Sequence, residues 1–141
     1  RKNPRWPEKD IALVDVDPVA VRSARRNARL NGLTDRCSFS TRPLHQLGQR
    51  FDVVVANIEV WVLLGLASSL AERLRPGATL ILSGLLGERA PEVAARFGEL
   101  GLQIDARHRE KGWESLELSP KPDHPRIWAT RGRLGRKARP P

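Results

Sequence analysis

The chain has 141 residues, 40% of them hydrophobic and 29% charged, which is the composition of a soluble globular protein with room for one domain. No apolar run approaches the roughly 20 residues that span a bilayer, and no secretory signal opens the chain, so we expect a cytoplasmic protein with no membrane association. Cys37 is the only cysteine, and the three histidines lie far apart. These counts exclude an internal disulfide and argue against a metal site.

The positive charge is concentrated at the C-terminal end. The net charge is +9, and the residues from Lys121 onward hold seven basic side chains against one acid, which contributes +6 of it. A basic tail with many prolines and glycines, here residues 120–141, is typical of a solvated, disordered extension. The alternative is electrostatic attraction to RNA, with Trp128 available to stack on bases.

The N-terminal end predicts no regular structure. Residues 1–10 hold two prolines among several charged residues, and we expect an irregular lead-in. The chain contains no methionine and begins with Arg1, so we expect a fragment or a protein processed at its N-terminus.

The stretch that follows organises the rest of the chain. Residues 11–15 form an apolar run that ends in Asp15, which predicts a buried parallel strand. Asp17 and Pro18 then favour the start of a helix that runs to about Asn31. Asp15 therefore stands at the carboxyl end of a strand, where open α/β sheets bind ligands and an acid commonly holds a ribose. The alternative is that Asp15 and Asp17 only cap the helix.

The next segments alternate strands with helices. A central buried strand is predicted over residues 51–58, and Asn57 stands at its end as Asp15 does at the end of the earlier strand. The remaining predicted elements are a weak strand at 37–41, a loop at 42–50, a helix at 59–74, a turn at 75–77, a strand at 78–83 and a helix at 88–100.

The alternation of strands and helices stops near the C-terminal end. Residues 102–107 and 113–118 alternate apolar with polar side chains on either side of a Glu110-Lys111-Gly112 turn, which is typical of a β-hairpin. The chain is therefore predicted to be α/β, with parallel strands, flanking helices and a terminal antiparallel pair.

This order resembles the class I methyltransferases that use S-adenosylmethionine, with a Rossmann-like sheet, of which only part is present here. The sequence motifs resemble most those of the methyltransferases that modify protein eleven of the large ribosomal subunit. The matching pieces lie within residues 11–119 and are VDVDPVAVRSARRNARLNGL (14–33), FDVVVANI (51–58), LAERLRPGATLILSGLL (70–86) and the closing hairpin with GW at 112–113.

The resemblance implies a cofactor and two site residues. It makes Asp15 the acid that accepts hydrogen bonds from both ribose hydroxyls of S-adenosylmethionine, a task that suits a charged acceptor. It places Asn57 at the methyl-transfer edge, in contact with cofactor and substrate, where its amide orients the substrate amine. The implied reaction is N-methylation of a protein, here a ribosomal protein. The alternative for Asn57 is a strand-end residue that satisfies loop amides.

The resemblance also has gaps. The family domain begins with a strand and a glycine-rich loop that approaches the methionine part of the cofactor, and RKNPRWPEKD resembles neither. The usual acid for the adenine amino group is replaced by the stretch at residues 41–43. We therefore expect the C-terminal two-thirds of a methyltransferase domain, without the substrate-recognition domain, and weak cofactor binding by this part alone.

Two further functions compete with this interpretation. One is a non-catalytic methyltransferase-like remnant that binds RNA or the ribosome through its basic tail. The other is a nicotinamide oxidoreductase, which shares the acid after the second strand. The predicted hairpin and the missing glycine fingerprint argue against the oxidoreductase.

Overall fold

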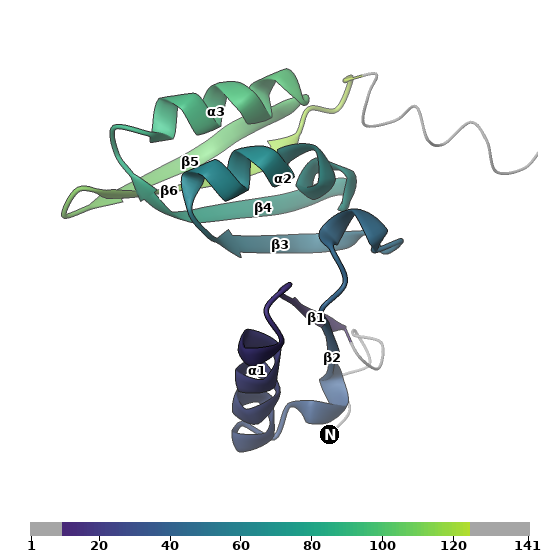
Figure 1. Ribbon diagram of the computed structural model, residues 1–141. Coiled ribbons are helices and arrows are strands. Elements are labelled where there is room, and N and C mark those ends of the chain that lie inside the picture. Colours follow the sequence, from purple (N-terminus) through teal and green to yellow (C-terminus); the bar gives the residue numbers. More distant parts are fainter. Residues whose placement is uncertain (1–9, 125–141) are drawn as a thin grey trace, which may run out of the picture. The chain divides into compact units, whose positions relative to one another are not determined.

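The computed structural model describes residues 10–124, which divide into two compact units on either side of Gly48. Both units combine strands with helices, as the sequence predicts (Figure 1). Within residues 10–124, no helix has the length and apolar character needed to cross a membrane.

The first unit consists of one helix on a two-stranded parallel sheet. Strand β1 (Ile11–Val14) pairs with β2 (Cys37–Ser40), and helix α1 (Pro18–Leu30) connects them, followed by a 3-10 turn, η1 (Thr34–Arg36). The helix packs its apolar side against both strands and buries Val21 and Ala28. Gly32 adopts a φ of +66° just beyond the helix, in the left-handed conformation expected of a glycine that ends a helix.

The second unit is a four-stranded mixed sheet in the order β3-β4-β6-β5. Strands β3 and β4 are parallel, and β6 pairs antiparallel with both β4 and β5. The short 3-10 turn η2 (Leu44–Gln46) lies at the end of the first unit. The elements of the second unit in chain order are β3 (Phe51–Asn57), α2 (Val60–Glu72), β4 (Leu74–Leu86), α3 (Ala90–Glu99), β5 (Leu102–Glu110) and β6 (Trp113–Pro120).

The core of the second unit lies between one face of this sheet and the helices α2 and α3, which lie on the same side of it (Figure 1). Leu63 from α2 and Phe97 from α3 are fully buried there, together with Leu80, Leu82, Leu116 and Leu118 from the strands. Side chains alternate between the two faces of a strand. Leu80 and Leu82 on β4, and Leu116 and Leu118 on β6, are each two residues apart and therefore share the face that the helices cover.

The other face of β3 is open within the described residues. Val53 and Val55 are 57% and 65% exposed, and Asn57 follows on the same face by alternation. No strand among residues 10–124 pairs with the edge of β3 opposite β4, or with the edge of β1 opposite β2. The first strand of each unit, β1 and β3, therefore has one unpaired edge within the described residues.

The predicted elements are present, with three corrections. The strand at residues 51–58 is predicted as central and buried, but within the described residues β3 is the edge strand of its sheet, with Val53 and Val55 exposed because no further strand or helix covers them. The predicted turn at residues 75–77 lies inside β4, where a register shift lets the strand pair with β3 on both sides of it. The strand then continues past Gly84 to Leu86 through a second register shift, where a loop was predicted. The 42–50 loop contains the short 3-10 turn η2. The hairpin turn at Lys111 and Gly112 is confirmed, with φ values of 50° and 86° that match a type I′ turn.

Candidate functional site

Asp15 follows β1 directly at the carboxyl end of the first unit's sheet. Its backbone N–H donates to the carbonyl of Ser40 at 3.2 Å, which fixes it beside the end of β2. One oxygen of its exposed carboxylate accepts a hydrogen bond from the backbone N–H of Asp17 at 2.9 Å. Asp17 in turn accepts from the N–H of Val19 at 2.8 Å and is the N-cap of α1. Asp15 therefore supports the turn before the helix with one oxygen, and its other oxygen makes no hydrogen bond within the described residues.

Asn57 is the last residue of β3 and lies opposite Ser83 of β4. Its side chain lies against Gly84, which adopts a φ of +73°. A methyl group at Gly84 would overlap the Oδ1 atom of Asn57. The carboxamide therefore occupies space that only a glycine on the neighbouring strand leaves free, and it stays exposed to solvent.

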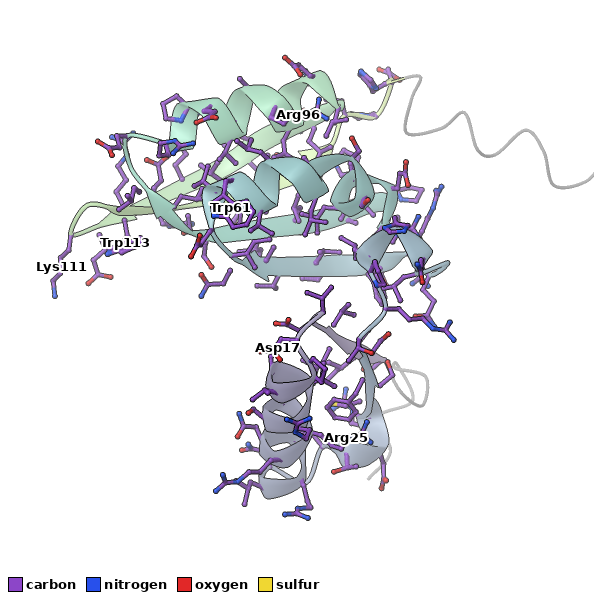
Figure 2. All side chains as sticks on the ribbon, viewed as in Figure 1. Asp17, Arg25, Trp61, Arg96, Lys111 and Trp113 are labelled. Atoms are coloured by element: carbon purple, nitrogen blue, oxygen red, sulfur yellow. The ribbon has the colours of Figure 1, made fainter. Side chains whose placement is uncertain are left out.

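An exposed indole lies just beyond Asn57, and sequence reasoning missed it. Trp61, in the first turn of α2, is 71% exposed (Figure 2). Its indole N–H donates a hydrogen bond to the carboxylate of Glu59. The chain thus presents a carboxamide, a carboxylate and an aromatic ring within five residues at the carboxyl end of β3. The sequence shows a tryptophan shortly after the predicted strand end, but only the structure shows that its ring is exposed.

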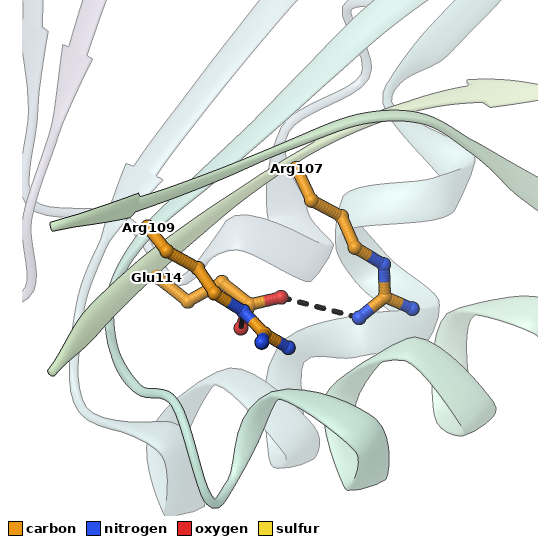
Figure 3. Close-up of polar contacts among 3 residues, drawn as sticks. All are labelled: Arg107, Arg109 and Glu114. Atoms are coloured by element: carbon orange, nitrogen blue, oxygen red, sulfur yellow. Dashed lines mark hydrogen bonds and ion pairs between the residues drawn. The ribbon is translucent and has the colours of Figure 1, made fainter.

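A buried ionic cluster at the hairpin was also missed. The side chain of Glu114 is fully buried, and its two oxygens accept hydrogen bonds from Arg107 at 3.1 Å and from Arg109 at 2.7 Å (Figure 3). Glu114 lies on the same face of β6 as the buried Leu116. The two guanidinium groups compensate the carboxylate that this position brings into the core.

An open pocket among the described residues lies at the turn of this hairpin. It is lined by Gly87, Arg109, Glu110, Lys111, Gly112 and Trp113. Trp113 is 53% exposed at its rim. β6 begins opposite the C-terminal end of β4, and Asn57 pairs with Ser83 near that same end. The pocket and Asn57 therefore lie toward the same end of the strands of this sheet.

The two residues predicted as the site belong to different units. Asp15 lies in the first unit and Asn57 in the second, each at the carboxyl end of a strand. That they face one ligand stays a prediction. The basic tail, with Trp128, lies outside the described residues except for its first positions.

Comparison with known proteins gives a consistent result. The family model described as ribosomal protein L11 methyltransferase (PrmA) matches residues 7–121. A ribosomal protein L11 methyltransferase of Geobacter sp. (strain M21) is 44% identical over 109 residues, which cover 77% of this chain and 35% of that protein. One of Trichlorobacter lovleyi is 39% identical over 112 residues, 79% of this chain and 37% of the relative. The chain spans about a third of the length of these relatives.

Solved structures share the arrangement. A crystal structure of ribosomal protein L11 methylase from Lactobacillus delbrueckii subsp. bulgaricus matches with a TM-score of 0.75 at 30% identity, over 80% of this chain and 58% of that one. A magnesium protoporphyrin IX methyltransferase from Synechocystis PCC 6803, solved with bound SAM, matches with a TM-score of 0.62 at 20% identity, over 78% of this chain and 59% of that one. At this identity the second match concerns the fold alone.

Proposed function

The chain belongs to the ribosomal protein L11 methyltransferase family, and from this premise we propose that it forms part of an S-adenosylmethionine-dependent N-methyltransferase acting on a ribosomal protein. In this proposal, residues 11–119 belong to one methyltransferase domain. The observation that carries the proposal is the family match over residues 7–121, which includes both strand ends with polar side chains.

Two side chains fit the cofactor in their chemistry. Asp15 has one oxygen engaged in the turn and a second available, and a carboxylate suits the ribose hydroxyls because it accepts charge-assisted hydrogen bonds. When bound, S-adenosylmethionine supplies an electrophilic methyl group. Asn57 lies at the end of β3 with an exposed carboxamide, whose oxygen accepts a hydrogen bond from the substrate amine and so orients its lone pair. The expected role of Asn57 is positioning rather than proton removal.

The unpaired edge of β3 supports the expectation that this chain alone binds the cofactor weakly. Val53 and Val55 are exposed, and no strand among residues 10–124 covers that edge. Exposed apolar strands at a free edge are typical of surfaces that pair with further chain. We expect residues 1–141 alone to bind S-adenosylmethionine weakly. The alternative is a non-catalytic protein that binds RNA or the ribosome through its basic tail. Most of that tail lies outside the described residues, so the alternative stays a prediction.

Calorimetry tests the proposal. S-adenosylmethionine is titrated into the full-length gene product and into its Asp15→Ala variant, and methyl incorporation into ribosomal protein L11 is measured in parallel. We expect binding heat that disappears in the variant. Asn57→Ala should lower turnover far more than cofactor affinity, because positioning acts on the transition state. Wild-type protein without binding heat or methyl incorporation would contradict the proposal, and equal losses of turnover and affinity would contradict the role of Asn57.

A further inference from the structure

Helix α1 carries a stripe of four arginines on its exposed side. Their spacing of i, i+3, i+4 and i+7 places them on one face of an α-helix. The helix contains no acidic residue from Pro18 to Leu30. All four are exposed, and we call them the α1 arginine stripe: Arg22, Arg25, Arg26 and Arg29.

The stripe differs from most other arginines of the described residues in having no acidic partner. None of its guanidinium groups forms an ion pair with a carboxylate within residues 10–124. Most other arginines in this part of the chain do form one, and these pairs are Arg36–Asp10, Arg73–Glu72, Arg75–Asp52, Arg89–Glu92, Arg96–Glu99, and Arg107 and Arg109 with Glu114. Carboxylates of the described residues therefore leave the positive charge of α1 exposed and unneutralised.

The arrangement of the stripe costs stability and holds one of its members in place. Like charges at i, i+4 destabilise a helix by about 0.2–0.5 kcal/mol per pair. The guanidinium of Arg25 lies 4.8 Å from the centre of the Phe39 ring on β2, a cation–π contact that limits its motion (Figure 2 labels Arg25). An external anion would relieve the repulsion and meet one guanidinium already oriented.

The dimensions and chemistry of the stripe fit a phosphodiester backbone. From Arg22 to Arg29 the helix rises about 10 Å, at 1.5 Å per residue. Each strand of a duplex carries one phosphate per roughly 3.4 Å of helix axis, and a single strand can extend beyond this spacing, so the length of the stripe matches about two to three phosphates. The planar guanidinium fork binds phosphate oxygens in pairs. A membrane surface fits less well, because the apolar side of α1 packs on β1 and β2 with Val21 and Ala28 buried.

We propose that the α1 arginine stripe binds the phosphodiester backbone of a nucleic acid, independently of the methyl-transfer site. Arg22, Arg26 and Arg29 make the phosphate contacts, while Arg25 remains on Phe39. The interaction reads charge and not base sequence, since backbone contacts carry no sequence information.

Salt-dependent binding of a labelled oligonucleotide tests the proposal. Fluorescence anisotropy is measured with the full chain and a 20-nucleotide single-stranded RNA, and with DNA of the same sequence, over a range of salt concentrations. The slope of log K against log salt changes by about 0.7 for each phosphate contact on a single strand. We therefore expect R22Q/R26Q/R29Q to lower the slope by about 2, and R22K/R26K/R29K to leave it within about 0.5 of wild type.

A matched variant separates local contact from net charge. R75Q/R89Q/R96Q removes the same charge with the same substitutions, but each of these arginines is paired with a carboxylate. We expect it to change the slope by less than about 0.5. All variants keep the basic tail, so its contribution cancels. Glutamine has nearly the helix propensity of arginine, and circular dichroism should give the same helix content.

The results divide clearly. A loss of slope in the stripe variant for either oligonucleotide, with little change in the matched variant, supports the proposal and identifies RNA or DNA as the source. Equal losses of slope in both glutamine variants would overturn it, because net charge would then explain binding, and a stripe variant with the wild-type slope would overturn it as well. A stripe variant that loses binding only to phosphatidylserine vesicles would overturn it in favour of a lipid surface.

Discussion

Replacing Gly84 by alanine tests whether β4 holds the Asn57 carboxamide in position. Gly84 has a φ of +73°, and a Cβ atom there would overlap the Oδ1 atom of Asn57. Gly77, on the same strand, has a φ of +72°, but a Cβ atom there would meet no atom within 4 Å. An alanine at either position would carry the same backbone strain, but only at Gly84 would its Cβ atom meet a neighbouring side chain.

The expected magnitudes follow from these contacts. A left-handed conformation costs a residue with a Cβ atom about 1–2 kcal/mol, so both alanine variants should lose that much stability. At Gly84 the Asn57 side chain must also leave its position, and a displaced rotamer costs about 0.5–1.5 kcal/mol. Gly84→Ala should therefore exceed Gly77→Ala by about this amount. The excess should vanish when Asn57→Ala is present, because the overlapping oxygen is gone.

Urea denaturation measures the free energies of unfolding of the wild type, Gly84→Ala, Asn57→Ala and the double variant. Gly77→Ala is measured in the wild-type and Asn57→Ala backgrounds as the control. A displaced Asn57 should also slow methyl transfer in the full-length gene product, since a shift of about 1 Å can cost up to roughly 100-fold in rate. Its cofactor affinity should change little. If Gly84→Ala and Gly77→Ala destabilise equally in the wild-type background, the contact between Asn57 and Gly84 contributes nothing, and the argument fails.

Three further predictions concern stability. Glu114→Gln should cost about 1–3 kcal/mol, because it weakens charge-assisted hydrogen bonds of a buried side chain, whereas Glu117→Gln, at an exposed pair, should cost under about 0.5 kcal/mol in the same denaturation assay. The Arg36 guanidinium donates a hydrogen bond that lowers the pKa of Asp10, so the stabilisation is present above the ordinary carboxyl pKa of about 4 and is lost as the pH falls through the lowered value. Melting temperatures of wild type and Asp10→Asn should therefore converge in acid, and a constant difference would contradict this. Asp17→Ala should cost about 1 kcal/mol by thermal unfolding, and Asp17→Asn much less because it keeps the capping oxygen.

Local backbone chemistry explains which parts of the fold could be predicted. The N-cap at Asp17, the left-handed Gly32 and the Lys111–Gly112 turn each depend on a few consecutive residues, and all three are confirmed. The turn predicted at residues 75–77 is wrong, because the same residues form an irregularity inside β4. The partner strand decides between the two, since β3 pairs with β4 at Leu74 and again at Thr79. That pairing is a long-range fact, which local propensity does not contain.

The alternation of side chains along β6 carries a signal for the burial of Glu114. Leu116 and Leu118 are buried on β6, and side chains two apart share a face, so Glu114 had to point into the core as well. Trp113 is also apolar but stands on the opposite face by alternation, so the sequence alone leaves the phase of this strand open. The partners of Glu114 lie on β5, and only the register of the hairpin brings Arg107 and Arg109 beside it.

The two interpretations of Asp15 that the sequence leaves open are compatible in this geometry. One carboxylate oxygen accepts the N–H of Asp17, which orients the group, and the second oxygen is available for a ribose. Asp15→Asn keeps an oxygen for the turn but removes the charge, whereas Asp15→Ala removes both. If Asp15 holds the cofactor, Asp15→Asn in the full-length gene product should keep its melting temperature while its affinity for S-adenosylmethionine falls at least tenfold, in line with the roughly 1.5–3 kcal/mol of charged hydrogen bonds. If Asp15 only supports the turn, Asp15→Asn should bind the cofactor as wild type does, and Asp15→Ala should lose stability without a specific loss of affinity.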